Sequence, residues 1–226
     1  MWGCPAPGYH PHGRPEIERA LVLPLNVVAA MPKEVAGGAR RVDRILLDYL
    51  AQRGKSVQTI GFRDAVAAWQ AGESDCRSAA AKGCDRFTRV AAYAARRLRA
   101  DHDYDVLIVP YLLLRGAKTD GREASFDGVE RPVRMSGYAP DSPYGYARGR
   151  IRAVSLKVYG FSPDGKKMFD GIGGLDVVDR IEASDERPGA YDIEVRENVL
   201  SDPEAIREGV ARALSPFVPR PKPSRD

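Results

Sequence analysis

Cysteine and histidine are both scarce in this sequence, which holds three of each among its 226 residues. Three cysteines exclude the dense disulfide framework on which small secreted scaffolds depend. His10 and His12 lie close together, but no third ligand follows nearby, so two exposed histidines are favoured over a metal site. No Cys-x-x-Cys or His-Glu-x-x-His motif occurs either. The sequence therefore predicts no metal site and no cofactor.

Long hydrophobic runs are missing as well. No stretch of about 18 apolar residues occurs, so the sequence as written predicts no membrane-spanning helix. A hydrophobic fraction of 43% and a charged fraction of 29% are those of a globular protein and exclude a wholly disordered chain. The length fits one α/β domain, or at most two small ones. A net charge of +4 is a weak field over such a chain and indicates little about its partners.

The motifs of common active sites are also absent. No Gly-x-Ser-x-Gly nucleophile motif occurs. The segment Gly171–Gly174 lacks both the strand–glycine–helix order of a dinucleotide site and the lysine of a P-loop. His102 stands among aspartates in Asp101–Asp105, where a polar loop that ends a helix is favoured over a hydrolytic site. We therefore expect a protein that is not an enzyme and has no catalytic residues.

What the sequence does contain is the succession of apolar patterns typical of an α/β domain. We expect a flexible N-terminal tether at residues 1–16, a single α/β domain at 17–217 and a disordered C-terminal tail at 218–226, because prolines crowd both ends. Strands are expected at 17–28, 56–62, 104–114, 124–135, 150–160 and 167–180, and helices at 33–53, 63–70, 84–100 and 203–217. The predicted fold class is α/β with α+β character: a single mixed β-sheet with helices packed on it, in which early β-α-β alternation is followed by an antiparallel meander and a C-terminal helix.

Several residues predict where these elements bend or end. Pro110 is expected to interrupt its strand, since proline cannot donate a hydrogen bond to a β-ladder. The segment Ser162–Gly165 predicts a tight turn, and Ser201 and Glu204 have the spacing of a capping box. The glycines of Gly171–Gly174 predict a β-bulge or a close approach of two backbones.

Cys4 follows Gly3 and precedes a linker rich in proline and glycine. A small residue, a cysteine and a linker in this order are typical of the lipid attachment site of a bacterial lipoprotein. The charged and apolar parts of a signal segment do not precede them. Lipid attachment therefore requires that Met1 is a late start or that the signal was removed. The alternative is an unmodified cysteine in a disordered end.

Cys76 and Cys84 are the other two cysteines. One continuous helix would separate them by about 12 Å, at roughly 1.5 Å per residue, whereas a disulfide requires Cα atoms within about 7 Å. A disulfide between them therefore requires the chain to fold back, and Gly83 is the natural place for this. The alternative is a pair of unpaired thiols in a reducing cytoplasm.

Two segments carry side chains suited to partners. The long loop at 136–150 holds Tyr138, Tyr144 and Tyr146, which favours contacts with another protein. The helix expected at 84–100 carries an arginine-rich face, which consists of Arg89, Arg96, Arg97 and Arg99. A solvated helix face is favoured for these arginines over a phosphate-binding one.

The order of elements and several short motifs resemble envelope proteins related to the curli secretion lipoprotein CsgG and to the N-terminal domain of TolB. The aliphatic run, proline and asparagine of Leu21–Asn26 are similar to the first strand of those domains, and Asp103–Ile108 is similar to a later strand. Leu46–Leu50, the hairpin around Asp164–Gly165 and the last helix follow in the same order. The resemblance spans about 17–217 and implies a periplasmic lipoprotein at the outer membrane of a Gram-negative cell. Such proteins assemble into rings or support secretion, export or envelope machines, and the resemblance supplies no catalytic residues.

We therefore expect a non-catalytic structural or assembly subunit of a secretion, export or envelope complex, which faces the periplasm and is held at the outer membrane by a lipid on Cys4. Its expected partners are an envelope protein complex or further copies of itself, with Tyr138–Tyr146 and the sheet edges as contacts. Nucleic acid is not expected as a partner. The alternative is a soluble nucleotide- or RNA-binding α/β module that uses the arginine-rich helix face. That module would lie in the cytoplasm if no signal segment precedes Met1.

Overall fold

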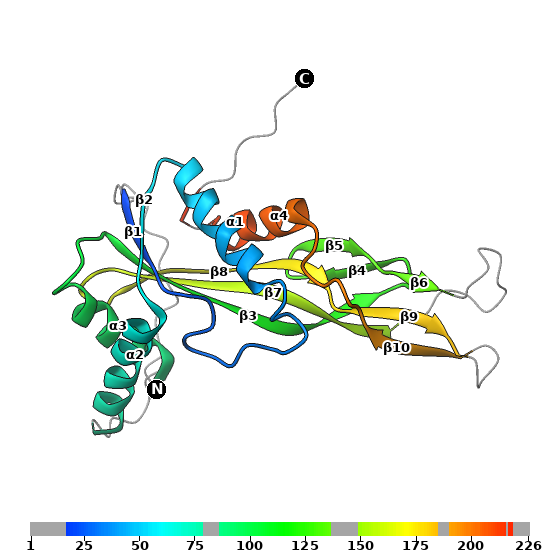
Figure 1. Cartoon of the computed structure of the whole chain (residues 1–226), viewed down its shortest axis with the longest axis horizontal. Coiled ribbons are helices and arrows are strands. Elements are labelled where there is room, and N and C mark those ends of the chain that lie inside the picture. The colour runs from blue at the N-terminus through cyan, green and yellow to red at the C-terminus, as the bar shows by residue number, and fades with distance from the viewer. Residues whose placement is uncertain (1–16, 79–85, 137–148, 185–189, 216, 219–226) are drawn as a thin grey trace, which may run out of the picture.

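The computed structural model describes residues 17–78, 86–136, 149–184, 190–215, 217 and 218. Seven strands form a mixed sheet (Figure 1): β1 (Arg19–Val22), β2 (Ser56–Thr59), β3 (Val106–Thr119), β4 (Glu123–Phe126), β5 (Val129–Pro132), β7 (Gly149–Phe161) and β8 (Lys167–Val177). A second sheet consists of β6 (Met135–Ser136), β9 (Asp179–Ala183) and β10 (Tyr191–Val195). The helices of the described ranges are α1 (Ala39–Gln52), α2 (Phe62–Ser78), α3 (Arg86–Leu98) and α4 (Pro203–Ala213). The predicted α/β class with a mixed sheet is confirmed, and the small sheet is an addition to the single sheet that we expected.

The large sheet combines a parallel part with an antiparallel part. β1 lies between β2 and β3 and pairs with both in parallel, with α1 as the crossover between β1 and β2. β7 then pairs with β3 and β8 in an antiparallel manner. The pairing of β3 with β7 continues along nearly the whole of both strands, from Leu107 opposite Phe161 to Thr119 opposite Gly149. This long ribbon forms the spine of an elongated molecule (Figure 1).

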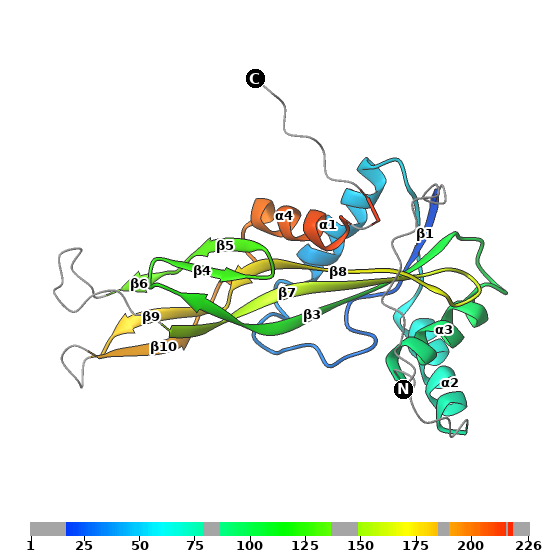
Figure 2. The ribbon, with the colours of Figure 1, turned by 180° about the vertical axis from the view of Figure 1, so that it is seen from behind.

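Helices cover both faces of the sheet (Figure 2). α1 and α4 pack on one face, over a core cluster that includes Ile108 and Leu156. α2 and α3 pack on the other face, over a cluster that includes Leu107 and Val109. Because neighbouring strand residues point to opposite faces, one unbroken apolar run in β3 supplies both cores. No helix in the described ranges is both long enough and apolar enough to cross a membrane.

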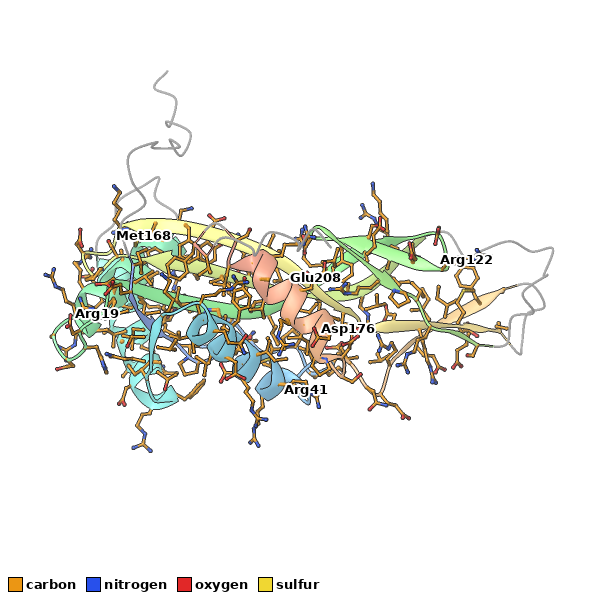
Figure 3. The ribbon with its side chains drawn as sticks, turned by 90° about the horizontal axis from the view of Figure 1, so that it is seen from above. Arg19, Arg41, Arg122, Met168, Asp176 and Glu208 are labelled. Carbon is orange, nitrogen blue, oxygen red and sulfur yellow. The ribbon has the colours of Figure 1, made fainter. Side chains whose placement is uncertain are left out.

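A third cluster lies beyond the helices, where the β4–β5 hairpin and β9 cover the far ends of β3 and β7. Phe126, Ile151 and Ile181 are buried there. Figure 3 shows Arg122 at this end of the molecule and Arg19 and Met168 at the opposite end. The small sheet therefore lies far from α2 and α3, at one end of the long axis (Figure 1).

β3 continues through Pro110, so the predicted interruption there is wrong. The N–H of Leu23 donates to the carbonyl of Ile108 at 2.9 Å, on the β1 side of β3. The N–H of Leu112 donates to Asn26 Oδ1 at 2.9 Å on the same side. Since backbone groups alternate between the two edges of a strand, the nitrogen of Pro110 also faces this side, where β1 has already ended. The proline therefore removes no hydrogen bond from the β3–β7 ladder.

Three further features differ from the prediction. The single strand expected at 124–135 includes a hairpin, because Asp127 and Gly128 adopt φ values of 39° and 79° and reverse the chain between β4 and β5. The helix expected at 63–70 extends to Ser78. The N-cap of α4 is Asp202, whose carboxylate accepts from the N–H of Glu204 at 2.9 Å, and not the preceding serine.

The aspartate that precedes β3 fixes the start of β1. Asp105 accepts hydrogen bonds from the backbone N–H groups of Glu18 at 3.0 Å and Arg19 at 2.9 Å, and from the Arg19 guanidinium at 2.8 Å. The hydrogen bond from the Arg19 side chain is the main cause that lowers the pKa of Asp105 to about 2. The carboxylate is therefore charged at neutral pH and joins the first residues of β1 to the loop before β3.

The glycines of β8 meet the backbone of α4, which confirms the predicted close approach. A Cβ atom built on Gly173 would lie 2.0 Å from the carbonyl oxygen of Gly209, and one built on Gly171 would lie 1.9 Å from that of Ala213. β8 also shifts register against β7 near Gly174, as expected for a β-bulge. α4 therefore rests directly on the β8 backbone.

Candidate functional site

The most distinctive surface of the described chain is the open edge of the small sheet. β10 forms this edge and pairs with β9 alone among the described strands. Tyr191, Ile193 and Val195 are 38%, 48% and 43% exposed. They alternate along the strand, so their side chains share one face and form an apolar row. Large exposed hydrophobic side chains that gather on one face are typical of a binding surface.

This apolar row continues the buried core of the small sheet. Ile193 stands directly opposite Ile181 of β9, and opposite residues of an antiparallel pair share a face. Ile181 is 1% exposed and belongs to the third core cluster, against which Met135 of β6 also packs. The apolar core is thus shielded from solvent at Ile181 of β9 and exposed to solvent at Ile193 of β10.

The other face of the β9–β10 pair is rich in carboxylates. Asp192 lies opposite Glu182, and Glu194 lies opposite Arg180. Arg180 Nη2 contacts Glu194 Oε2 at 2.6 Å, and its Nε contacts Glu182 Oε1 at 2.9 Å. The hydrogen bond to Glu194 is the main cause that raises the pKa of the Arg180 guanidinium. One strand therefore carries an apolar face and an acidic face.

Ion pairs hold the base of this small sheet on the large one. Arg196, just after β10, is 9% exposed and donates to Asp176 Oδ1 at 2.7 Å and to the carbonyl of Val177 at 2.6 Å. Asp179 at the start of β9 is 2% exposed and accepts from Arg152 Nη2 at 2.8 Å. Charge-assisted hydrogen bonds of this kind fix geometry well. The β10 edge is therefore presented on a firmly anchored support, close to Asp176 in Figure 3.

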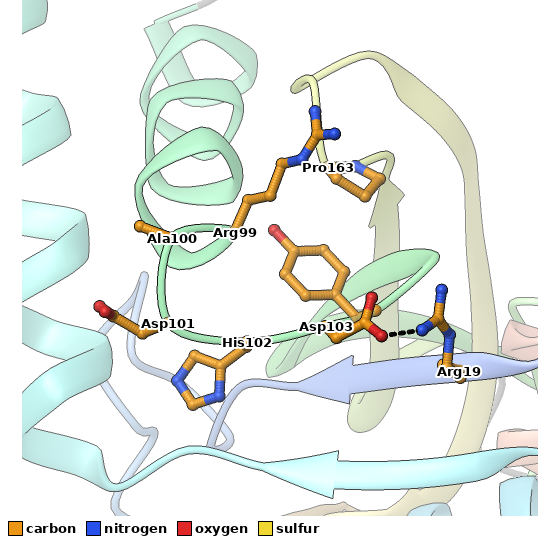
Figure 4. Close-up of a pocket in the computed structure, with 8 residues that line it drawn as sticks. Arg19, Arg99, Ala100, Asp101, His102, Asp103 and Pro163 are labelled. Carbon is orange, nitrogen blue, oxygen red and sulfur yellow. Dashed lines mark hydrogen bonds and ion pairs between the residues drawn. The ribbon is translucent and has the colours of Figure 1, made fainter.

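Two pockets lie elsewhere. Within each pocket, polar side chains contact one another. A pocket of about 440 Å³ next to His102 contains the ion pair between Arg19 and Asp103 (Figure 4). The imidazole of His102 points away from that pair in Figure 4. Tyr104 donates its hydroxyl to the carbonyl of Ala95 at 2.5 Å, and burial raises its pKa to about 12. None of the residues that line this pocket brings a nucleophile to the imidazole of His102.

The second pocket, of about 700 Å³, lies between the β4–β5 hairpin and α4. Arg131 reaches Glu208 at 2.7 Å across it and also donates to the carbonyls of Leu175 and Ala205. These contacts join the hairpin to the helix. Among the described residues, no group of three histidine, cysteine, aspartate or glutamate side chains is placed to bind a metal ion.

The predicted site residues fall mostly outside the described ranges. Cys4, Cys84 and the three tyrosines Tyr138, Tyr144 and Tyr146 lie outside the described residues. Cys76 lies in α2 and packs, partly buried, against the second core cluster. Lipid attachment, the Cys76–Cys84 disulfide and the tyrosine contacts therefore stay predictions.

Three residues of the arginine-rich face (Arg89, Arg96 and Arg97) lie on α3, and Arg99 directly follows it, at the end of the molecule opposite the small sheet. Arg96 and Arg97 are in the last turn of the helix, where cations interact favourably with the helix dipole. Arg96 also donates to the carbonyl of Asp164 in the β7–β8 turn at 3.4 Å. Part of this face thus supports the fold.

β10 was not among the expected strands, although its signal is visible in the sequence. Tyr191–Val195 alternates apolar and acidic residues over five positions, which is the pattern of a half-exposed strand.

Comparison with known proteins assigns the chain to no family. No protein-family model matches the chain, and no curated protein matches it either.

Proposed function

We propose that the protein is a non-catalytic assembly subunit that binds a protein partner through the β10 edge. The observation that carries the proposal is the apolar row of Tyr191, Ile193 and Val195 on a strand that pairs, within the described part of the chain, with β9 alone. An edge strand with exposed hydrophobic side chains is costly in water and prone to aggregate unless another chain covers it. Addition of a partner strand would satisfy the open backbone groups and bury the row.

The proposed setting is the periplasmic face of the outer membrane, in a secretion, export or envelope complex. It is supported by the Gly3–Cys4 pattern and by the resemblance of the domain to CsgG-related and TolB-related envelope proteins. One acyl chain binds a membrane only marginally, so stable anchoring requires full lipoprotein acylation or a bound partner. A partner on β10 would supply part of that attachment.

A photo-cross-linking residue at position 193 tests the interaction. We expect one defined adduct with another protein in the cells of origin, because a partner strand would lie within reach of the Ile193 side chain. The matched control is the same cross-linker at Arg97, which is exposed on α3 at the other end of the molecule. Equal adducts from both positions, or none from position 193, would contradict the proposal.

Metabolic labelling with a fatty acid tests the anchor. The gene, with its natural upstream sequence, should yield a labelled protein, and Cys4→Ala should lose that label because the acyl chain would be attached through the Cys4 thiol. Cys76→Ala is the matched control and should label like the wild type. Label retained in Cys4→Ala would remove the lipoprotein part of the proposal while leaving the β10 interaction open to its own test.

A further inference from the structure

We infer that the partner of β10 is a second copy of this chain, paired antiparallel to it across a two-fold axis at Ile193. This inference rests on the proposed function, and a second copy is the protein partner proposed above. Three features of β10 support it: the direction of its backbone groups, the symmetry of its five-residue sequence and the face on which its apolar row lies.

The residues of the apolar row also turn their backbone groups away from β9. Just after the strand, the N–H of Arg196 donates to the carbonyl of Val178 at 2.9 Å, so residue 196 makes its hydrogen bond toward the β9 side. Backbone groups alternate between the two edges of a strand in an antiparallel pair. The N–H and C=O groups of Tyr191, Ile193 and Val195 therefore point to the side on which a further strand would add.

The sequence of β10 is symmetric in polarity about Ile193. Tyr191–Val195 runs apolar, acidic, apolar, acidic, apolar, so its pattern is identical in both chain directions. In an antiparallel pair of two β10 strands centred on Ile193, that residue stands opposite its own copy and Tyr191 stands opposite Val195. Both members of each pair turn their backbone groups toward the other strand, so each pair can exchange two hydrogen bonds. One register therefore satisfies these backbone groups and matches apolar with apolar residues.

The antiparallel arrangement also keeps both apolar rows on one face of the sheet. Its two-fold axis stands perpendicular to the sheet, which reverses the strand direction and leaves the faces unchanged. A two-fold axis along the strands would pair them in parallel and turn one row to the opposite face. Ile193 lies beside the buried Ile181 in each copy, so the antiparallel pair would join the third core clusters of the two chains. Such an isologous interface closes at two subunits.

The acidic residues of β10 are compatible with this pairing because Arg180 already holds one of them. In the antiparallel register, Asp192 of one copy stands opposite Glu194 of the other. Arg180 Nη2 contacts Glu194 Oε2 of its own chain at 2.6 Å. Asp192 would therefore meet an ion pair, with the arginine one strand further along the same row.

The size of the contact sets the strength of the dimer. β10 has five residues, whereas stable protein–protein interfaces bury about 1,200–2,000 Å². We therefore expect a weak dimer whose population rises with protein concentration. Attachment of many chains to one membrane through Cys4 would raise their effective concentration and favour it.

Cysteine cross-linking of the full chain tests the two-fold register. On oxidation with copper phenanthroline, Ile193→Cys should form a disulfide with its own copy, because the Cα atoms of a hydrogen-bonded pair lie about 5.5 Å apart. Val195→Cys should not, since its own copy would lie roughly 14 Å away. A mixture of Tyr191→Cys and Val195→Cys chains should regain the cross-link. Peptide mass spectrometry identifies the joined residues and separates these products from disulfides of the natural cysteines.

Sedimentation velocity measures the dimer itself. The sedimentation coefficient of the wild type should rise with protein concentration. Ile193→Lys should raise the dissociation constant of the dimer at least about tenfold, because the two lysines would stand opposite each other. The matched control is Phe62→Lys, which makes the same kind of change at a side chain that is 60% exposed on α2 and should leave the dimer unchanged. Circular dichroism confirms that each variant is folded.

Three results would overturn the inference. These are a chain that stays monomeric at every concentration, a dimer that Ile193→Lys leaves intact, and equal cross-linking of Ile193→Cys and Val195→Cys. If the inference holds, the photo-cross-linked adduct from position 193 has the mass of two copies of this chain. A defined adduct of any other mass would leave the proposed function standing and show that only the identity of the partner is wrong. Loss of the adduct itself would remove both.

Discussion

Gly173→Ala is expected to destabilise the domain by about 3 kcal/mol, because the new methyl group would collide with the backbone of α4. A Cβ at this position would lie 2.0 Å from the carbonyl oxygen of Gly209 and 2.9 Å from its carbonyl carbon. Both are backbone atoms, so no side chain can rotate to relieve the contact. Either α4 or β8 must move.

Movement of α4 is costly because the helix is held on several sides. Ile206 and Val210 are completely buried in the core cluster beneath it. The contact is also mutual, since a Cβ on Gly209 would lie 2.3 Å from the carbonyl oxygen of Gly174. A shift large enough to admit one methyl group would therefore open gaps around both aliphatic side chains, and such gaps lose packing energy.

Urea unfolding measures this effect, with Gly116→Ala as the matched control. Gly116 is also in a strand of the large sheet, but a Cβ there meets nothing within 4 Å and its φ is not positive. We expect the control to be neutral or slightly stabilising, whereas Gly173→Ala should lower the urea midpoint with an unchanged slope. Similar midpoints for the two variants would show that α4 does not rest on the β8 backbone as described.

Local pattern was enough to predict most of this fold. Strand and helix periods predicted the order of the described helices and of the long strands, but not the division into β4 and β5 or the separate strands β9 and β10. The glycines of Gly171–Gly174 predicted a close approach without showing which element would approach. The failures arose where a local rule depends on a neighbour. Pro110 is tolerated because its missing N–H faces the end of β1. The hairpin at Asp127–Gly128 was missed, although Asp-Gly between apolar residues is a strong turn signal.

The candidate site could not be predicted as a site. The alternation in Tyr191–Val195 identifies a strand, but it does not show that the strand will end a sheet or which of its faces will stay open. That depends on β9, whose other edge pairs with β6. Ile193 therefore lies beside a core that is already closed beneath Ile181. Burial of one apolar residue and exposure of its cross-strand neighbour is a property of tertiary structure alone.

Asn26→Asp is expected to lower the free energy of unfolding by about 3 kcal/mol at neutral pH. The substitution places a carboxylate where a buried amide now hydrogen-bonds to the edge of β3. Asn26 is 8% exposed. Its Oδ1 accepts from the N–H of Leu112 at 2.9 Å, and its Nδ2 donates to the carbonyl of Leu112 at 3.0 Å and to that of Ala30 at 3.3 Å. One side chain therefore replaces a strand partner just beyond Pro110.

The substitution keeps the shape of the side chain but removes the Nδ2 donor of Asn26. Aspartate tolerates the φ of 60° found at Asn26 about as well as asparagine does. A carboxylate can still accept from the N–H of Leu112, but it would face the carbonyls of Leu112 and Ala30 without a proton between them. Burial and these carbonyls both disfavour the charged form, so the new carboxyl should have a folded-state pKa above its unfolded value of about 3.9.

The sign of the pH dependence then separates this cause from simple loss of packing. A group whose pKa is raised on folding binds its proton more tightly in the folded state, so Asn26→Asp should regain stability as the pH falls through that raised pKa. Urea midpoints of the variant and the wild type should therefore converge between neutral pH and about pH 4. Asn198→Asp makes the same change at an exposed position and is the matched control, with no such convergence expected. A constant difference at every pH would show that the amide of Asn26 does not donate to the edge of β3.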